Sequence, residues 1–77
     1  MLWYYEKLSE DDASVLYAYG WNTKETTGQL LYDKTSKKIT IIKIADNDNQ
    51  KGAEWAACHL PDIFENGYPE KDFVIIG

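Results

Sequence analysis

The stretch at residues 14–21, SVLYAYGW, places a large side chain at every second position. The large residues are Val15, Tyr17, Tyr19 and Trp21. Alternate side chains of a β-strand point to opposite faces of a sheet, so this segment predicts a strand with three aromatic rings in a row on one face. The fold must therefore include a sheet that either buries this stripe or presents it to a ligand.

Strand patterns occupy most of the rest of the chain, and a single helical pattern interrupts them. The expected strands cover residues 2–8, 14–21, 29–33, 38–45 and 73–77. Turn formers at 9–13 and 34–37 separate successive strands and predict hairpins. We therefore expect one α+β domain over residues 1–77, with the order ββββαβ: an antiparallel meander of four strands, one main helix on one sheet face, and a C-terminal strand. The pattern leaves open whether the last strand is parallel or antiparallel to its neighbour.

The helical pattern covers residues 51–60, and its start and end carry capping signals. Asp48 or Asn49 can accept a hydrogen bond from a free amide of the first turn. Pro61 favours the start of a second short turn over 61–66. The residues on one side of the helix are Ala53, Ala56, Ala57 and Leu60. Such a small face packs densely only against large partners, so it predicts that the aromatic stripe is core beneath the helix.

One helix cannot cover the whole sheet, because it is about 10–12 Å across and strands lie about 4.8 Å apart. Without a bulge, Ile42 and Ile44 share the face opposite Ile39 and Ile41. Trp55 lies opposite the alanine face and is either an exposed interaction residue or covered by a loop residue such as Tyr68. The candidate interaction surface is Trp55, His59, Trp3, Tyr5, Ile42 and Ile44.

The charge and the sequence of the N-terminus restrict the class of partner and the cellular location. The formal net charge is −5, from 13 acidic and 8 basic residues, which disfavours nucleic-acid binding. Lys34, Lys37 and Lys38 lie in an expected turn and are interpreted as solvated. No signal peptide or membrane span is recognisable, so we expect a cytoplasmic protein with no membrane partner. Because the chain starts at Met1 and carries no visible tag, we expect a complete small gene product.

Motifs that resemble chemical sites fail on spacing or geometry. The acidic run at 46–50 resembles a calcium loop, but Lys51 and Ala57 stand where such a loop needs glycine and a bidentate acid. Cys58 and His59 are adjacent on the helix and point about 100° apart, and Glu54 opposes activation of the thiol, so a structural cysteine is the favoured interpretation. Three carboxylates at 10–12 are better explained as a solvated turn than as a magnesium site. We expect no catalytic, cofactor-binding or metal-binding residues and no cofactor.

Three function classes are compatible with these features. The first is a non-catalytic protein-interaction module whose partner is itself or another protein, with a homodimer formed through the uncovered sheet face. The second is an inhibitor or immunity-type protein that binds a basic partner, since the chain is acidic and electrostatic steering would speed association. The third is a small ligand-binding or enzymatic domain with a pocket lined by tyrosine and tryptophan.

Overall fold

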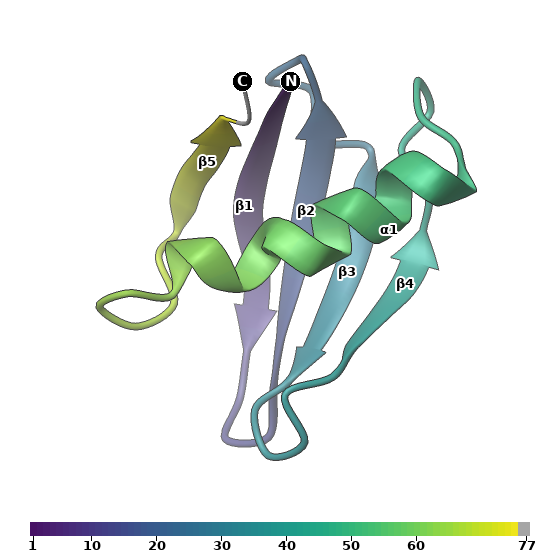
Figure 1. Ribbon diagram of the computed structural model, residues 1–77. Helices are drawn as coiled ribbons and strands as arrows, with labels where there is room; N and C mark the ends of the chain where they lie inside the picture. Colours follow the sequence, from purple (N-terminus) through teal and green to yellow (C-terminus); the bar gives the residue numbers. More distant parts are fainter. Residues whose placement is uncertain (76–77) are drawn as a thin grey trace.

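The computed structural model describes residues 1–75 and shows a five-stranded antiparallel sheet with one helix across it (Figure 1). The elements are β1 (Leu2–Glu10), β2 (Ser14–Trp21), β3 (Gly28–Asp33), β4 (Ile39–Lys43), α1 (Gln50–His59), the 3₁₀ helix η1 (Leu60–Ile63) and β5 (Lys71–Ile75). The predicted α+β order of four meander strands, a helix and a C-terminal strand is confirmed. The predicted final strand also included residues 76 and 77, which lie outside the described residues.

The strand order in the sheet is β4-β3-β2-β1-β5. The first four strands follow one another as hairpins, and β5 then returns beside β1 on the far side of the sheet from β4. All pairings are antiparallel. The helix therefore carries the chain from one edge of the sheet to the other, which places β4 and β5 at the two edges (Figure 1).

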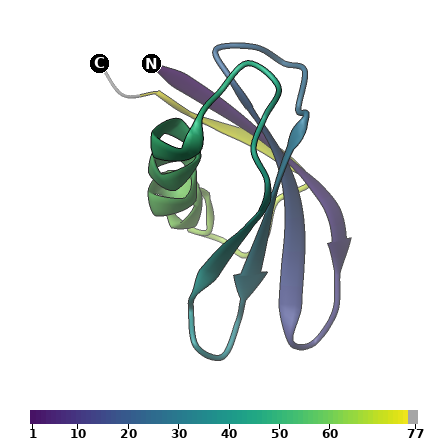
Figure 2. The ribbon, with the colours of Figure 1, turned by 90° about the vertical axis from the view of Figure 1, so that its right-hand side faces the viewer.

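The aromatic stripe of β2 is core beneath the helix, as the small-residue face of the helix predicts. Val15, Tyr17 and Tyr19 are inaccessible to solvent, and Trp21 is half-buried against the same cluster. α1 lies over this face and leaves the opposite face without a helix (Figure 2). Burial of Ala53 and Ala56 shows that the small-residue face of α1 is the face turned to the rings.

Capping follows the expected residues at both ends of α1. The Asn49 side chain accepts a hydrogen bond from the Gly52 backbone N–H at 2.9 Å. At the other end, the Leu60 N–H bonds to the Ala57 carbonyl as the helix tightens into η1, with Pro61 in its first turn. The Tyr5 hydroxyl donates to the Ala56 carbonyl at 2.7 Å, so a β1 side chain ties the sheet to the end of α1.

A β-bulge at Ile42 corrects the predicted facing of the β4 isoleucines. Lys43 pairs with Gln29 and Ile41 pairs with Leu30, which leaves Ile42 as the extra residue. The extra residue reverses the alternation, so Ile44, just beyond the strand, packs against the core cluster rather than on the open face. The prediction that Ile42 and Ile44 share one surface is therefore wrong.

The loop between β2 and β3 covers part of the open face near the end of β2. A Cβ on Gly20 would collide with the backbone carbonyl oxygens of Thr23 and Glu25, so the loop lies directly on this glycine. Ala18, on the same face, is also buried. The exposed part of the open face is therefore smaller than the whole sheet.

Aromatic residues after η1 close the far end of the core. The Phe64 ring lies 4.8 Å from both the Tyr32 and the Tyr68 ring centroids. The ammonium of Lys34 lies 4.8 Å from the centroid of the Tyr68 ring. Tyr68 therefore covers this end of the core. The alternative that Tyr68 folds over Trp55, which the sequence left open, is wrong.

Candidate functional site

The six residues predicted as one interaction surface divide between the core and two separate surfaces. Trp3 and Tyr5 are only 1% and 2% exposed, so their assignment to a surface is wrong. They lie on the helix face of β1, because the strand's even-numbered residues, not its odd-numbered ones, face away from α1. Ile42 is exposed at the bulge, whereas Trp55 and His59 lie on the other side of the molecule, on α1.

The most exposed apolar group on the open face lies on the paired strands β1 and β5. We call it the open-face patch; it consists of Leu2, Tyr4, Phe73 and Ile75. Leu2 is paired with Ile75, and Tyr4 with Phe73, whose ring centroids are 6.0 Å apart. Phe73 is 52% and Ile75 67% exposed. None of these four residues was among the candidates from the sequence. The signal that could have pointed to them is that Phe73 and Ile75, two positions apart in the last strand, share one face of the sheet.

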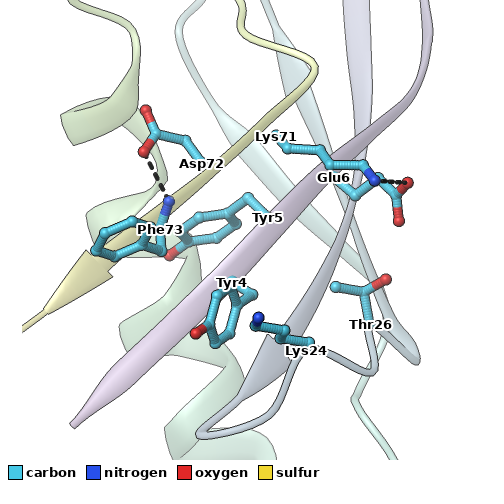
Figure 3. Close-up of a pocket in the computed structure, with 8 residues that line it drawn as sticks. All are labelled: Tyr4, Tyr5, Glu6, Lys24, Thr26, Lys71, Asp72 and Phe73. Atoms are coloured by element: carbon cyan, nitrogen blue, oxygen red, sulfur yellow. Dashed lines mark hydrogen bonds and ion pairs between the residues drawn. The ribbon is translucent and has the colours of Figure 1, made fainter.

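A shallow depression of about 410 Å³ adjoins this patch (Figure 3). Tyr4 and Phe73 contribute their rings, and Lys24 and Thr26 reach it from the loop between β2 and β3. Next to it, the Lys71 ammonium lies 3.7 Å from a Glu6 carboxylate oxygen. The depression therefore combines an apolar floor with a margin that carries both signs of charge.

A row with polar side chains limits the patch on one side. The cross-strand neighbours in this row are Lys71, Glu6, Ala18, Gln29 and Lys43. Beyond it, Leu16 and Leu31 are paired and form a second, half-buried apolar group. The open face is therefore mixed, with its most exposed apolar side chains gathered at the β5 edge.

All three tryptophans of the chain line a second cavity, at the start of α1. This cavity, which we call the tryptophan cleft, has a volume of about 340 Å³ and is lined by Trp3, Trp21 and Trp55. Its polar lining includes Asn47, Asp48, Asn49 and Lys51. Trp55 is 44% exposed, so the cleft has one wall at the surface. The sequence indicated an unusual position for Trp55 but assigned Trp21 to the core alone.

His59 joins the two tryptophans that the sequence analysis grouped with it. Its ring centroid lies 5.7 Å from that of Trp3, in a stacked arrangement, and 6.0 Å from that of Trp55. Its Nδ1 lies 3.1 Å from a carboxylate oxygen of Asp62, which orients the imidazole. Cys58, the neighbour of His59 in the chain, is a free cysteine and is exposed.

The buried tyrosines of the core act as hydrogen-bond donors. Burial raises the pKa of Tyr5 and of Tyr17 far above the usual range for a phenol. The Tyr17 hydroxyl donates to the Pro69 carbonyl at 2.7 Å. Burial also raises the pKa of Tyr19, whose hydroxyl accepts from the Ala45 N–H and donates to Asp48. These hydroxyls therefore stay protonated; Tyr5 holds α1 against the sheet, and Tyr17 and Tyr19 hold loops against it.

The acidic turn at residues 10–12 is largely engaged within the molecule. Glu10 contacts the ammonium groups of Lys7 and Lys34, both at 2.8 Å. Asp11 accepts hydrogen bonds from the backbone N–H groups of Ala13 and Ser14. The view of Lys34 as a solvated turn lysine is wrong, since it binds Glu10 and the Asp11 carbonyl. The turn thus presents fewer free carboxylates to a basic partner than its composition predicts.

Within residues 1–75, no three His, Cys, Asp or Glu side chains are grouped so that they could hold a metal ion. The helices of this same stretch are all too short or too polar to cross a bilayer.

Neither a protein-family model, nor a curated protein, nor a solved structure matches this chain.

Proposed function

We propose that this domain is a non-catalytic interaction module that self-associates through the open-face patch. The observation that carries the proposal is the exposure of Phe73 and Ile75 on an edge strand, next to Leu2 and Tyr4. Contiguous exposed apolar side chains with a polar margin are typical of protein–protein interaction sites. Burial of the patch would remove from water Phe73 and Ile75, two of the large apolar side chains that the fold leaves exposed on the sheet.

A second copy of the chain is the partner that the charge of this surface favours. Glu6 and Lys71 form an ion pair beside the patch, and Lys24 adds one positive charge to the margin, so the margin selects neither a strongly basic nor a strongly acidic partner. A dimer with two-fold symmetry brings the same patch from both copies together, which an apolar centre with a balanced margin permits.

The two edge strands of the sheet differ in how well they are protected against pairing with another chain. Edge strands avoid unwanted pairing through bulges and lysines. β4 has both, with the bulge at Ile42 and Lys43 beside it. β5 begins with Lys71 but pairs with β1 without a register shift, and it carries Phe73, Val74 and Ile75 in succession. The edge without a bulge thus adjoins the open-face patch, which favours association on this side of the molecule.

The size of the patch sets the expected affinity. A standard stable interface buries about 800 Å² on each partner, whereas the whole described surface is 4808 Å². Four side chains and their margin form a smaller contact than that, so we expect dissociation in the micromolar range.

Light scattering across protein concentration tests the proposal. The 8.9 kDa chain should rise toward twice this mass between about 1 μM and 1 mM. Phe73→Thr keeps a strand-favouring residue but removes the ring, and it should weaken the dimer by about 10- to 100-fold.

Trp55→Gln is the matched control, since it removes a comparably exposed ring from α1, on the opposite side of the sheet. It should leave the mass profile unchanged. A wild-type chain that stays monomeric up to millimolar concentration would overturn the proposal, as would equal effects of the two substitutions.

A further inference from the structure

We propose that the tryptophan cleft binds the quaternary ammonium group of a small solute. The cleft is separate from the open-face patch, and its volume of about 340 Å³ lies at the low end of the roughly 300–1,000 Å³ that small-molecule sites span. The indoles come from three elements: Trp3 from β1, Trp21 from β2 and Trp55 from α1. The fold therefore places three indoles around one site, with Trp21 and Trp55 partly exposed and Trp3 only 1% exposed. Indole is the side-chain ring that attracts cations most strongly.

The Asp48 carboxylate lines the same cleft. Asp48 accepts hydrogen bonds from the Asn49 N–H at 2.8 Å and from the Tyr19 hydroxyl at 3.3 Å. Among the described residues, no lysine or histidine forms an ion pair with it. Its negative charge therefore remains available to a bound cation, and the net charge of −5 favours the approach of cations.

Gly52 shows that the position of Asp48 depends on a specific residue. A Cβ at this position would collide with the Asp48 carboxylate. Glycine is unfavourable inside a helix relative to alanine. The chain nevertheless has glycine in the first turn of α1, and this leaves the space that the carboxylate occupies beside the cleft.

The remaining polar groups disfavour a sugar and an anion. A sugar needs free donors and acceptors, but the Asn47 amide donates to the Trp21 carbonyl and the Asn49 oxygen caps Gly52. An anion would face Asp48, while the amide of Gly52 at the start of the helix is already bonded. The groups that remain are the three indoles, the Asp48 carboxylate and the Lys51 ammonium. Indole rings beside a carboxylate are the chemistry of an aromatic cage for a methylated ammonium group.

The charge of Lys51 predicts the direction in which the affinity for the ligand changes when this charge is removed. Lys51 is exposed, lines the cleft and carries the same charge as the proposed ligand. It also forms no ion pair among the described residues. Removing its charge should therefore tighten binding of a cation, whereas it would weaken or leave unchanged the binding of an anion or a sugar.

Choline is the probe, and 3,3-dimethylbutan-1-ol is its uncharged counterpart of matching shape. A titration followed through the indole N–H signals in NMR spectra should show saturable shifts with choline at millimolar concentration. The neutral alcohol should bind at least about tenfold more weakly, because it lacks the cation–π and carboxylate attractions. Equal binding of the two probes, or no binding of choline, would overturn the proposal.

Three substitutions locate the binding in the cleft. Trp55→Leu and Asp48→Asn should each weaken choline binding by about tenfold, and Lys51→Gln should strengthen it a few-fold. Phe73→Thr is the control on the other face and should have no effect, so failure of the dimer leaves this test intact. Binding of a trimethyllysine peptide or of phosphatidylcholine vesicles, but not of choline, would show that the small-solute assignment is wrong.

Discussion

At the scale of single residues, the core combines aromatic rings with satisfied hydroxyls. Tyr5, Tyr17 and Tyr19 are buried, and each hydroxyl has a hydrogen-bond partner. A buried hydroxyl without a partner would cost about 1–3 kcal/mol. These tyrosines thus fill the space beneath a helix of small residues and also fix the segments that carry their partners.

Tyr5→Phe is expected to lower the free energy of unfolding by about 1–3 kcal/mol, because the Ala56 carbonyl at the end of α1 loses its donor. Tyr4→Phe, on the open face of the same strand, removes a hydroxyl with no hydrogen bond among the described residues and should change this free energy by less than about 0.5 kcal/mol. Urea unfolding of both variants measures the difference, and equal effects would contradict the assigned role of the Tyr5 hydroxyl.

At the scale of elements, two hairpins use the same turn chemistry. Asp33 accepts hydrogen bonds from the N–H groups of Thr35 and Ser36, both at 2.9 Å, as Asp11 does from its own turn. Such side-chain acceptors replace backbone partners in tight turns. The β1–β2 and β3–β4 connections are therefore each held by one carboxylate.

These carboxylates predict a loss of stability in acid. Hydrogen bonds from Ser36 and Thr35 hold the pKa of Asp33 below its usual 3.8. Because the folded pKa is the lower one, the stabilisation is present above pH 3.8 and is lost as the pH falls through the folded value. Asp33→Asn keeps an acceptor oxygen but cannot titrate, so it should flatten the decline of the urea midpoint between about pH 5 and pH 2.

Asp12→Asn is the control for this measurement, since Asp12 has no hydrogen bond or ion pair among the described residues. It should retain more of the acid dependence of the wild type than Asp33→Asn does. An unchanged slope in Asp33→Asn would show that the turn carboxylate is not a source of the acid sensitivity.

The order of the elements could be predicted from the sequence. Which side chains of each strand point to the core could be predicted only in part. The large side chains on one face of β2 match the small side chains on one face of α1, so the burial of Tyr17 and Tyr19 could be predicted from these two local patterns. In β1 both sets of alternate residues are apolar, and pattern alone cannot decide that Trp3 and Tyr5 are inside. The prediction for Ile44 was wrong for another reason. The extra residue at Ile42 moves the side chains after it to the opposite sheet face, and nothing in the local sequence indicates such a bulge.

At the scale of the whole molecule, one helix on a five-stranded sheet leaves two surfaces with distinct chemistry. The open-face patch at the β5 edge is apolar with a balanced margin, and the tryptophan cleft pairs indoles with the Asp48 carboxylate. Both depend on contacts between segments far apart in the chain. Trp3 and Trp55 of the cleft were among the candidates from the sequence, but neither surface could therefore be assembled from it.

The most direct test of self-association through the open face is an isotope-filtered NMR measurement on a mixture of labelled and unlabelled chains. It detects only contacts between copies. We predict intermolecular contacts from the Phe73 ring and the Ile75 methyl groups to the same patch of the other copy. Contacts confined to α1 or to the β4 edge, or none at concentrations where the mass doubles, would contradict the account.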